Sequence, residues 1–328
     1  MEFSLTDEQG WLAEAVEELV AGEPAERLWP ALVEFGALDP ELGVIERALV
    51  AHRLGRALAA VPYVDSAAAH HALEGIAAGT AAACCLHESG RRFAPDDPST
   101  SLDGTRLTGE KCGVAFAATV DVLVVPAATP IGTMIGLAAP AALELEAEAS
   151  LDPSLCTATV RFDGAEVGDG VVAGDIPRLA AVAGVLAAAE AVGAASAALG
   201  LACDYAAKRH QFGRTIASFQ AIRHLLADMY VGVESSWSSV LYACASLDER
   251  TPDCLRTASI AKAYTSRATH EVAHGALQVL GGIAFTVEHP AHLYLRRIVV
   301  RGSQFGTATE LEAELGRGLA RPPVEALS

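Results

Sequence analysis

The chain has 328 residues, of which 52% are hydrophobic, and its formal net charge is -18. This length exceeds what one hydrophobic core usually serves, so two or three packed sub-domains are expected. The acidic excess has the wrong sign for nucleic acid or for an anionic membrane surface, and neither partner is expected. Seven cysteines without Cys-x-x-Cys spacing favour reduced thiols. Residues 1–4 lack a basic segment followed by an apolar one, so we expect a cytoplasmic protein without a secretion signal.

Residues 1–79 predict an N-terminal helical domain. Thr6 and Gln9 form a capping-box pattern at the start of the first helix. Behind it, apolar residues recur at helical spacing: Trp11, Leu12, Ala15, Val16, Leu19 and Val20. A second helix is predicted over 42–58, ending near Pro62.

Residues 80–176 change period and predict a small middle β domain. Strand-like runs occur at 82–86, 119–125, 133–137 and 157–162, separated by Gly, Pro, Asp and Ser clusters.

Residues 177–328 predict a C-terminal domain of four helices, at about 178–208, 216–247, 251–284 and 291–318. The stretch 179–202 is apolar enough to resemble a membrane span, but it carries Glu190 near its centre. A charge at mid-bilayer costs about 2.5 to 3.5 kcal/mol, so we interpret the stretch as a buried helix.

Two motifs in the last block point to a flavin site. Tyr205 precedes Arg209-His210-Gln211-Phe212-Gly213 by one turn, and Gln278 precedes Gly281-Gly282. In this order and spacing, continuing through Pro290 and Arg296 to Gly306-Thr307, they resemble the C-terminal domain of the acyl-CoA dehydrogenases. The resemblance implies a mainly α fold with an N-terminal helical domain, a β-barrel-like middle domain and a C-terminal four-helix bundle.

The resemblance also implies which residues hold the pyrophosphate and adenine end of an FAD bound mainly to the neighbouring subunit. They are Arg209, Gln211, Phe212, Gln278, Gly281 and Gly282. A guanidinium can fork onto phosphate oxygens, and paired glycines let a backbone approach the cofactor without a Cβ clash. The alternative is that Arg209 is an ordinary helix-end charge and that Gly281-Gly282 is a C-cap.

The middle domain departs from the family where the flavin ring should lie. Family members have Thr-Glu-Pro and then Gly-Ser-Asp, whereas residues 86–92 keep only Glu88 and a glycine. A family Gly-x-Lys turn followed by tryptophan and threonine corresponds here to Gly109-Glu110-Lys111 followed by Cys112, so the aromatic is missing. We therefore expect an incomplete flavin-ring pocket beside an intact neighbour-facing surface.

The catalytic glutamate is also missing. The resemblance places this base at Phe305 or, in some members, at Arg267, and neither residue can remove a proton from Cα of a thioester. Glu271 is expected to pair with Arg267 at i,i+4. Glu310 lies about 140° round a continuous helix from Phe305 and should not share its pocket.

A second motif, His270-Glu271-Val272-Ala273-His274, matches the H-E-x-x-H pattern of zinc peptidases. Such a site needs a third ligand, and no downstream residue of suitable type and spacing supplies one. Two helix-surface histidines are the simpler interpretation.

The sequence thus predicts a shortened, non-catalytic subunit of a hetero-oligomeric, FAD-dependent acyl-CoA dehydrogenase, as in actinobacterial sterol side-chain degradation. The expected assembly is two plus two, with FAD shared with a catalytic partner that binds most of the acyl-CoA, and electron-transfer flavoprotein as acceptor. Three alternatives stay open: an active homo-oligomer with a displaced base, a flavin-free scaffold, and a zinc hydrolase through His270, Glu271 and His274.

Overall fold

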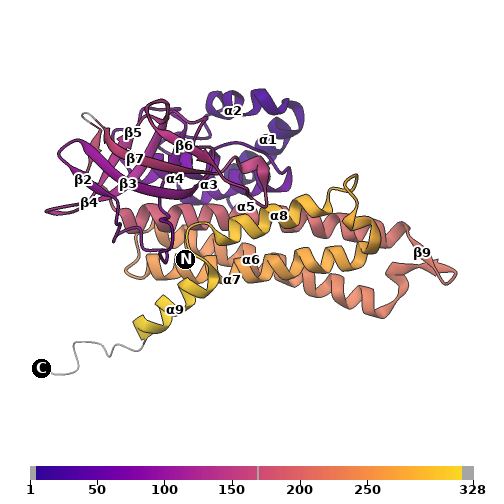
Figure 1. Ribbon diagram of the computed structural model, residues 1–328. Helices are drawn as coiled ribbons and strands as arrows, with labels where there is room; N and C mark the ends of the chain where they lie inside the picture. The colour runs from indigo at the N-terminus through magenta and orange to yellow at the C-terminus, as the bar shows by residue number, and fades with distance from the viewer. Residues whose placement is uncertain (1–4, 168–169, 320–328) are drawn as a thin grey trace, which may run out of the picture.

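The computed structural model describes residues 5–167 and 170–319. Helices, then strands, then helices follow one another along the chain, and the predicted fold class is confirmed. In Figure 1 the N-terminal helices and the sheet lie along one side of the long C-terminal helices.

The N-terminal block contains α1 (Asp7–Gly22), α2 (Ala25–Glu34), α3 (Val44–Arg56) and α4 (Tyr63–Ala72). The Thr6 side chain caps α1 and Gln9 caps it in return, so the capping box is confirmed. The helix predicted from the apolar spacing is present, and Trp11 on it is 65% exposed. Only Ala13 and Val16 of α1 are fully buried, since α1 meets the core along a narrow stripe.

The middle strands are β1 (Ala82–Cys84), β2 (Ser101–Asp103), β3 (Arg106–Val114), β4 (Val122–Thr129), β5 (Gly132–Ala138), β6 (Glu144–Ala147), β7 (Ala158–Glu166) and β8 (Val171–Val172). Within the described residues they form one sheet in the order β6-β7-β3-β2-β4-β5-β8, and β1 pairs in parallel with β4. The four predicted runs correspond to β1, β4, β5 and β7, whereas β2, β3, β6 and β8 were missed. The Gly109–Lys111 segment is not a turn but the interior of β3, paired with β7.

The C-terminal helices are α5 (Ile176–Lys208), α6 (Gln220–Asp248), α7 (Cys254–Leu280), α8 (Ala291–Ser303) and α9 (Ala308–Leu319). A hairpin of β9 (His210–Gln211) and β10 (Arg214–Thr215) joins α5 to α6. The predicted helix 291–318 is wrong as one element. It breaks between α8 and α9, where Phe305 and Gly306 take φ values of +58° and +94° that no helix continues through.

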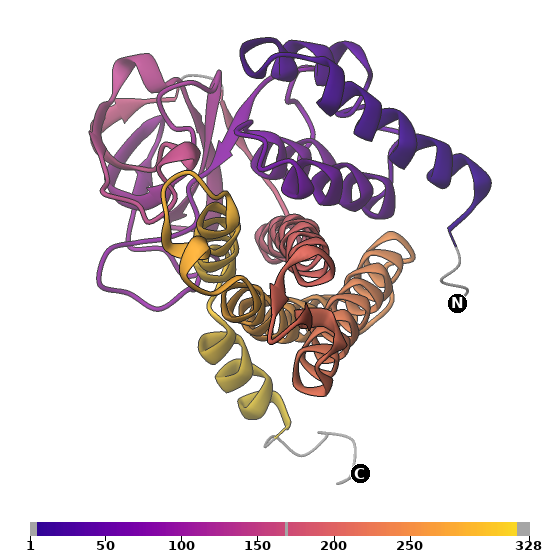
Figure 2. The same ribbon diagram turned by 90° about the vertical axis from the view of Figure 1, so that its right-hand side faces the viewer.

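Helix α5 is the centre of the molecule, and Figure 2 shows it end-on with the other elements around it. It is also the only helix in the described ranges that is long and apolar enough to cross a membrane, but 89% of that apolar window is buried inside the protein. Glycines allow α3 to cross it closely: a Cβ on Gly55 would lie 2.0 Å from the Glu190 carbonyl oxygen. The burial agrees with a core helix.

Candidate functional site

The first motif forms an exposed hairpin at the end of the helical bundle. Phe212 and Gly213 at its tip take φ values of +53° and +78°, and the Phe212 side chain is 93% exposed. The side chains of Arg209 and Gln211 are also exposed, and the structure gives Arg209 no ion pair among the described residues. An unpaired guanidinium, a side-chain amide and an exposed ring are therefore presented together.

The second motif ends α7 and passes into the 3-10 helix η4 (Gly281–Phe285). Gly281 takes φ +65° and ψ -142°, a conformation that favours glycine. A Cβ at Gly281 or Gly282 would meet nothing within 4 Å, so these glycines line open space. The Gln278 side chain is exposed beside them.

Packing brings the two motifs together. Tyr205, one turn before the hairpin, packs against a cluster formed by the last turns of α7, η4 and the start of α8: Leu277, Leu280, Ala284 and Ala291. In Figure 1 the β9 hairpin lies at the end of the bundle away from the sheet. Phe285 and Val287 add to the exposed apolar surface at the second motif, with 79% and 86% exposure. The donor set and the open glycine backbone fit the diphosphate and adenine part of a dinucleotide.

The turn between α8 and α9 is closed by aromatic contacts. Phe305 is 4% exposed, and its backbone amide donates to Nε2 of His87 at 2.8 Å. The His87 ring lies 4.8 Å from the Phe93 ring and 6.3 Å from the Phe305 ring, centre to centre. Burial lowers the pKa of His87 to about 4, so its imidazole is neutral and accepts this hydrogen bond.

Phe305 borders a pocket of about 500 Å³ between the loop 92–97, the start of α5, α7 and α9. Glu310 lines the same pocket, so its predicted orientation is wrong. The prediction assumed one continuous helix, and the break at Phe305 and Gly306 removes the 140° offset.

Glu310 is held by local hydrogen bonds. Its Oε1 accepts from the Phe93 amide at 2.9 Å, and its Oε2 accepts from the Thr307 amide and hydroxyl at 2.9 and 2.7 Å. Burial alone would raise the pKa of Glu310, but the hydrogen bonds from Thr307 and Phe93 outweigh it and lower the pKa. A carboxylate stabilised in this way is a weak base.

The residues of α5 that line the pocket beside Phe305 carry no ionisable group. Ala180, Ala181 and Gly184 of α5 line the pocket, and a Cβ on Gly184 would lie 3.7 Å from the Phe305 Cβ. Lys262 of α7, which the sequence did not single out, also lines the pocket, and its Nζ donates to the Arg301 carbonyl. Burial lowers the pKa of Lys262 to about 7.

The second predicted base position does not lie in this pocket. Arg267 is exposed on α7 and binds Glu312 of α9 with two hydrogen bonds, of 2.6 and 2.5 Å. The predicted pair between Arg267 and Glu271 is therefore wrong, because a partner on another helix offers bidentate geometry. The structure does not bring Arg267 and Phe305 together.

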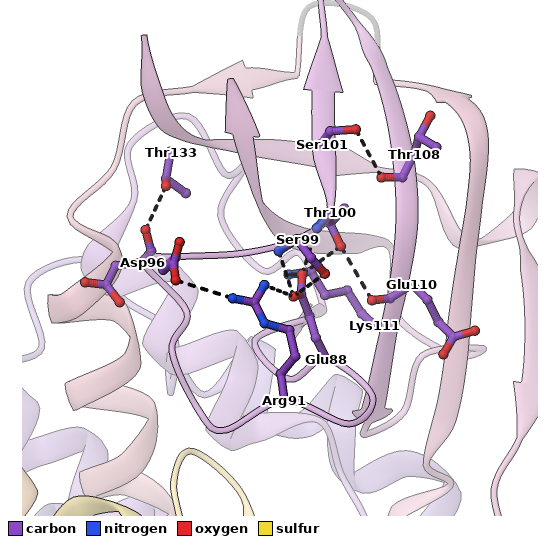
Figure 3. A network of polar contacts seen from close by, with 11 residues as sticks. Glu88, Arg91, Asp96, Ser99, Thr100, Ser101, Thr108, Glu110, Lys111 and Thr133 are labelled. Atoms are coloured by element: carbon purple, nitrogen blue, oxygen red, sulfur yellow. Dashed lines mark hydrogen bonds and ion pairs between the residues drawn. The ribbon is translucent and has the colours of Figure 1, made fainter. Parts of the chain in front are cut away.

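Glu88, the glutamate retained in the middle domain, is held in place by hydrogen bonds within that domain. Figure 3 shows it between the Lys111 ammonium and the Ser99–Thr100 segment. Its Oε1 accepts from Lys111 Nζ at 2.8 Å and from the amide and hydroxyl of Thr100 at 2.9 Å, and its Oε2 from those of Ser99 at 2.7 Å. Burial opposes ionisation, yet these hydrogen bonds lower the pKa of Glu88. It ties the loop after β1 to β3.

A buried ion network holds α8 in place just before the turn between α8 and α9. Arg297 binds Asp152 at 2.6 Å and Glu190 at 2.7 Å, and Arg301 binds Glu190 at 2.9 Å and Gln304 at 2.8 Å. These contacts join α8 to α5 and to the β domain. The sequence shows Arg297 and Arg301 at i,i+4 spacing, but this pattern does not predict that they are buried, because arginines are more often exposed.

His270 and His274 of the H-E-x-x-H pattern lie on the surface of α7, with Nε2 atoms 3.2 Å apart. Across the ranges that the structure describes, no group of three or more His, Cys, Asp or Glu residues is placed to hold a metal ion.

Comparison with known proteins finds relatives of the C-terminal helices and of the whole fold. A family model for the C-terminal domain of acyl-CoA dehydrogenases matches residues 181–311. Acyl-CoA dehydrogenase IpdE2 of Mycobacterium tuberculosis is 43% identical over 121 residues, which are 37% of this chain and only 36% of that relative. Acyl-CoA dehydrogenase FadE27 of the same organism is 29% identical over 345 residues, covering 90% of this chain and 88% of the relative.

Two solved structures share the whole fold. The ChsE4-ChsE5 complex from Mycobacterium tuberculosis matches with a TM-score of 0.88 and 25% identity, over 98% of this chain and 100% of that chain. The steroid acyl-CoA dehydrogenase Tcur3481-Tcur3483 matches with a TM-score of 0.84 and 23% identity, over 96% of this chain and 98% of that chain.

Proposed function

The chain belongs to the acyl-CoA dehydrogenase family, and we propose that it acts there as a non-catalytic subunit that completes the FAD site of a catalytic partner. In the family's reaction a carboxylate removes a proton from Cα of a thioester, and bound FAD supplies the acceptor for the β hydride. The proposal separates these two tasks between two subunits.

The proposal rests on the lack of a suitable base at Phe305, in the turn between α8 and α9. Phe305 is buried against His87 where the family has its base, and it has no ionisable group. Glu310 is the carboxylate nearest along the chain that lines this pocket, and both of its oxygens are already hydrogen-bonded. The remaining carboxylates of the lining are exposed and therefore well solvated: Asp96, Asp97 and Glu314.

The bundle end supports the second half of the proposal. Arg209, Gln211, Phe212, Gln278, Gly281 and Gly282 are exposed or half-exposed and would hold the diphosphate and adenine of an FAD whose ring lies in the partner. Exposed apolar side chains at Phe212, Phe285 and Val287 favour a surface that a partner covers.

We infer the partner and substrate class from the relatives. The ChsE4-ChsE5 structure is described as a complex of two proteins, and Tcur3481-Tcur3483 as a steroid enzyme. By this analogy we propose a hetero-oligomer that acts on a steroid acyl-CoA. The family resemblance of the sequence adds the two-plus-two assembly, a substrate bound mainly by the partner through its side-chain thioester, and electron-transfer flavoprotein as acceptor.

Cofactor content tests the proposal. The chain expressed alone should be colourless, and co-expression with the catalytic subunit should give one FAD per pair of subunits by visible flavin absorbance. Stoichiometric yellow protein from the lone chain would contradict it and favour a self-sufficient homo-oligomer.

The role of Arg209 is tested in the assembled complex. Arg209→Ala should weaken FAD retention by about 1.5 to 3 kcal/mol, the worth of a hydrogen bond to a charged group. The matched control is Arg223→Ala, which removes a different exposed arginine, located on α6. Equal retention in both variants after dialysis would assign Arg209 to the helix end.

A turnover assay separates the proposal from a displaced base. The lone chain should not oxidise acyl-CoA with an artificial acceptor, and mutating the partner's catalytic glutamate should abolish turnover of the complex. Glu271→Gln should leave the complex active. Activity in the lone chain that disappears with Glu271→Gln or Glu310→Gln would identify a real base here.

A further inference from the structure

Two histidines of α7 lie outside the site described above and converge on each other. His270 and His274 are one turn apart, their Nε2 atoms are 3.2 Å apart, and their ring centres are 4.4 Å apart. Their neighbours Thr269, Val272 and Ala273 are buried, so the helix that carries the two rings is anchored in the core. On this anchored helix His274 is exposed and His270 is half-buried.

The spacing of the two nitrogens equals that of two ligands on one metal ion. Two imidazoles bound at 2.0 to 2.1 Å in tetrahedral geometry place their nitrogens about 3.3 Å apart. Neutral imidazole is a suitable ligand for zinc, copper and nickel. Without a metal, one ring donates an Nε2–H to the other. Binding a metal through both Nε2 atoms therefore requires only that the donating ring move its proton to Nδ1, its other neutral tautomer.

We propose that His270 and His274 chelate one divalent late-transition-metal ion through their Nε2 atoms, with water in the remaining coordination positions. This site is independent of the proposed flavin function. The nearby Arg267 guanidinium does not occupy the proposed site, because it is ion-paired with Glu312.

The proposed site is a binding site and not a hydrolytic centre. A catalytic zinc needs three protein ligands, and the part of the chain that the structure describes places no third His, Cys, Asp or Glu with this pair. Glu271 is exposed between the two histidines in sequence, and its carboxylate is not one of the proposed ligands.

Titration of the full chain, stripped with a chelator, with zinc ions tests the site. One ion should bind, and His270→Asn and His274→Asn should each weaken binding by at least about tenfold, because either change removes the chelate advantage. The double variant should lose little more than each single variant. Zinc should raise the melting temperature of the wild type and not of the variants.

Two controls make the result decisive. His224→Asn removes an exposed histidine of α6, and Glu271→Gln removes the neighbouring carboxylate; both should keep the wild-type affinity within about twofold. The proposal is overturned if zinc does not bind, if the double variant binds as well as the wild type, or if the two single losses are small and simply add. A large loss with Glu271→Gln would also overturn it, since a third ligand would then be present.

Discussion

The backbone amide of Phe305 donates to Nε2 of His87 across 2.8 Å, and this bond joins the turn between α8 and α9 to the loop that follows β1. The bond thereby joins residues that are 218 positions apart in the chain. Phe93 and Glu310 join the same two segments with a second hydrogen bond of 2.9 Å.

Phe305→Glu should destabilise the protein without creating activity. The new carboxylate would be buried against the neutral His87, and Lys262 of the same pocket already donates to the Arg301 carbonyl, so the expected cost is about 3 kcal/mol. Burial raises the pKa of the introduced carboxyl, so the loss should grow as pH rises above about 4. Urea unfolding at several pH values measures it, with Phe305→Leu as the uncharged control. A pH-independent loss equal to that of the leucine variant would mean that the new carboxylate finds a partner.

Glu190→Gln should be strongly destabilising. The carboxylate neutralises both Arg297 and Arg301 in the interior, and removing one partner of a buried ion pair typically costs about 3 to 5 kcal/mol. The control is Arg106→Gln, which breaks the exposed Arg106–Glu166 pair and should cost less than about 1 kcal/mol. Similar unfolding midpoints for both variants would show that water or Asp152 compensates the two arginines.

Glu88→Gln should change how stability depends on acid. The folded-state pKa of Glu88 lies below its ordinary 4.5, so its contribution is present above that pH and is lost as pH falls through the folded pKa. The stability difference between wild type and variant should therefore be constant near neutral pH and shrink below about pH 4. A difference that stays constant down to the acid transition would remove Glu88 from the groups that control acid unfolding.

Asp65→Asn should make the protein more stable relative to the wild type as pH rises, whereas the loss of Glu88 makes it less stable. Burial raises the pKa of Asp65 from 3.8 to about 6, with Arg301 opposing the shift. A raised folded-state pKa means stability that is present below the unfolded pKa and lost as pH rises towards 6. The asparagine keeps an acceptor for the Cys84 amide and does not ionise. The free energy of unfolding of the variant should therefore rise relative to that of the wild type between about pH 4 and pH 6. Asp103→Asn, at an exposed site, should show no such crossover.

The sequence by itself determined features that depend on neighbours within a few residues. The capping box at Thr6, the long helices α5, α6 and α7, and the absence of a carboxylate at Phe305 can all be read locally. Strand β2 was missed because it has only three residues, and β3 because its burial does not alternate along its length. Pairing with other strands decided the conformation of both.

Only the tertiary structure decided which distant groups meet. Arg297 reaches Glu190 and Asp152 across 107 and 145 residues of chain, and no local periodicity encodes such partners. Glu310 shares the pocket of Phe305 because two residues with positive φ break a helix that composition alone would continue. Helical periodicity gives the direction of a side chain only while the helix lasts, and beyond the break the packing of α9 against α7 sets that direction.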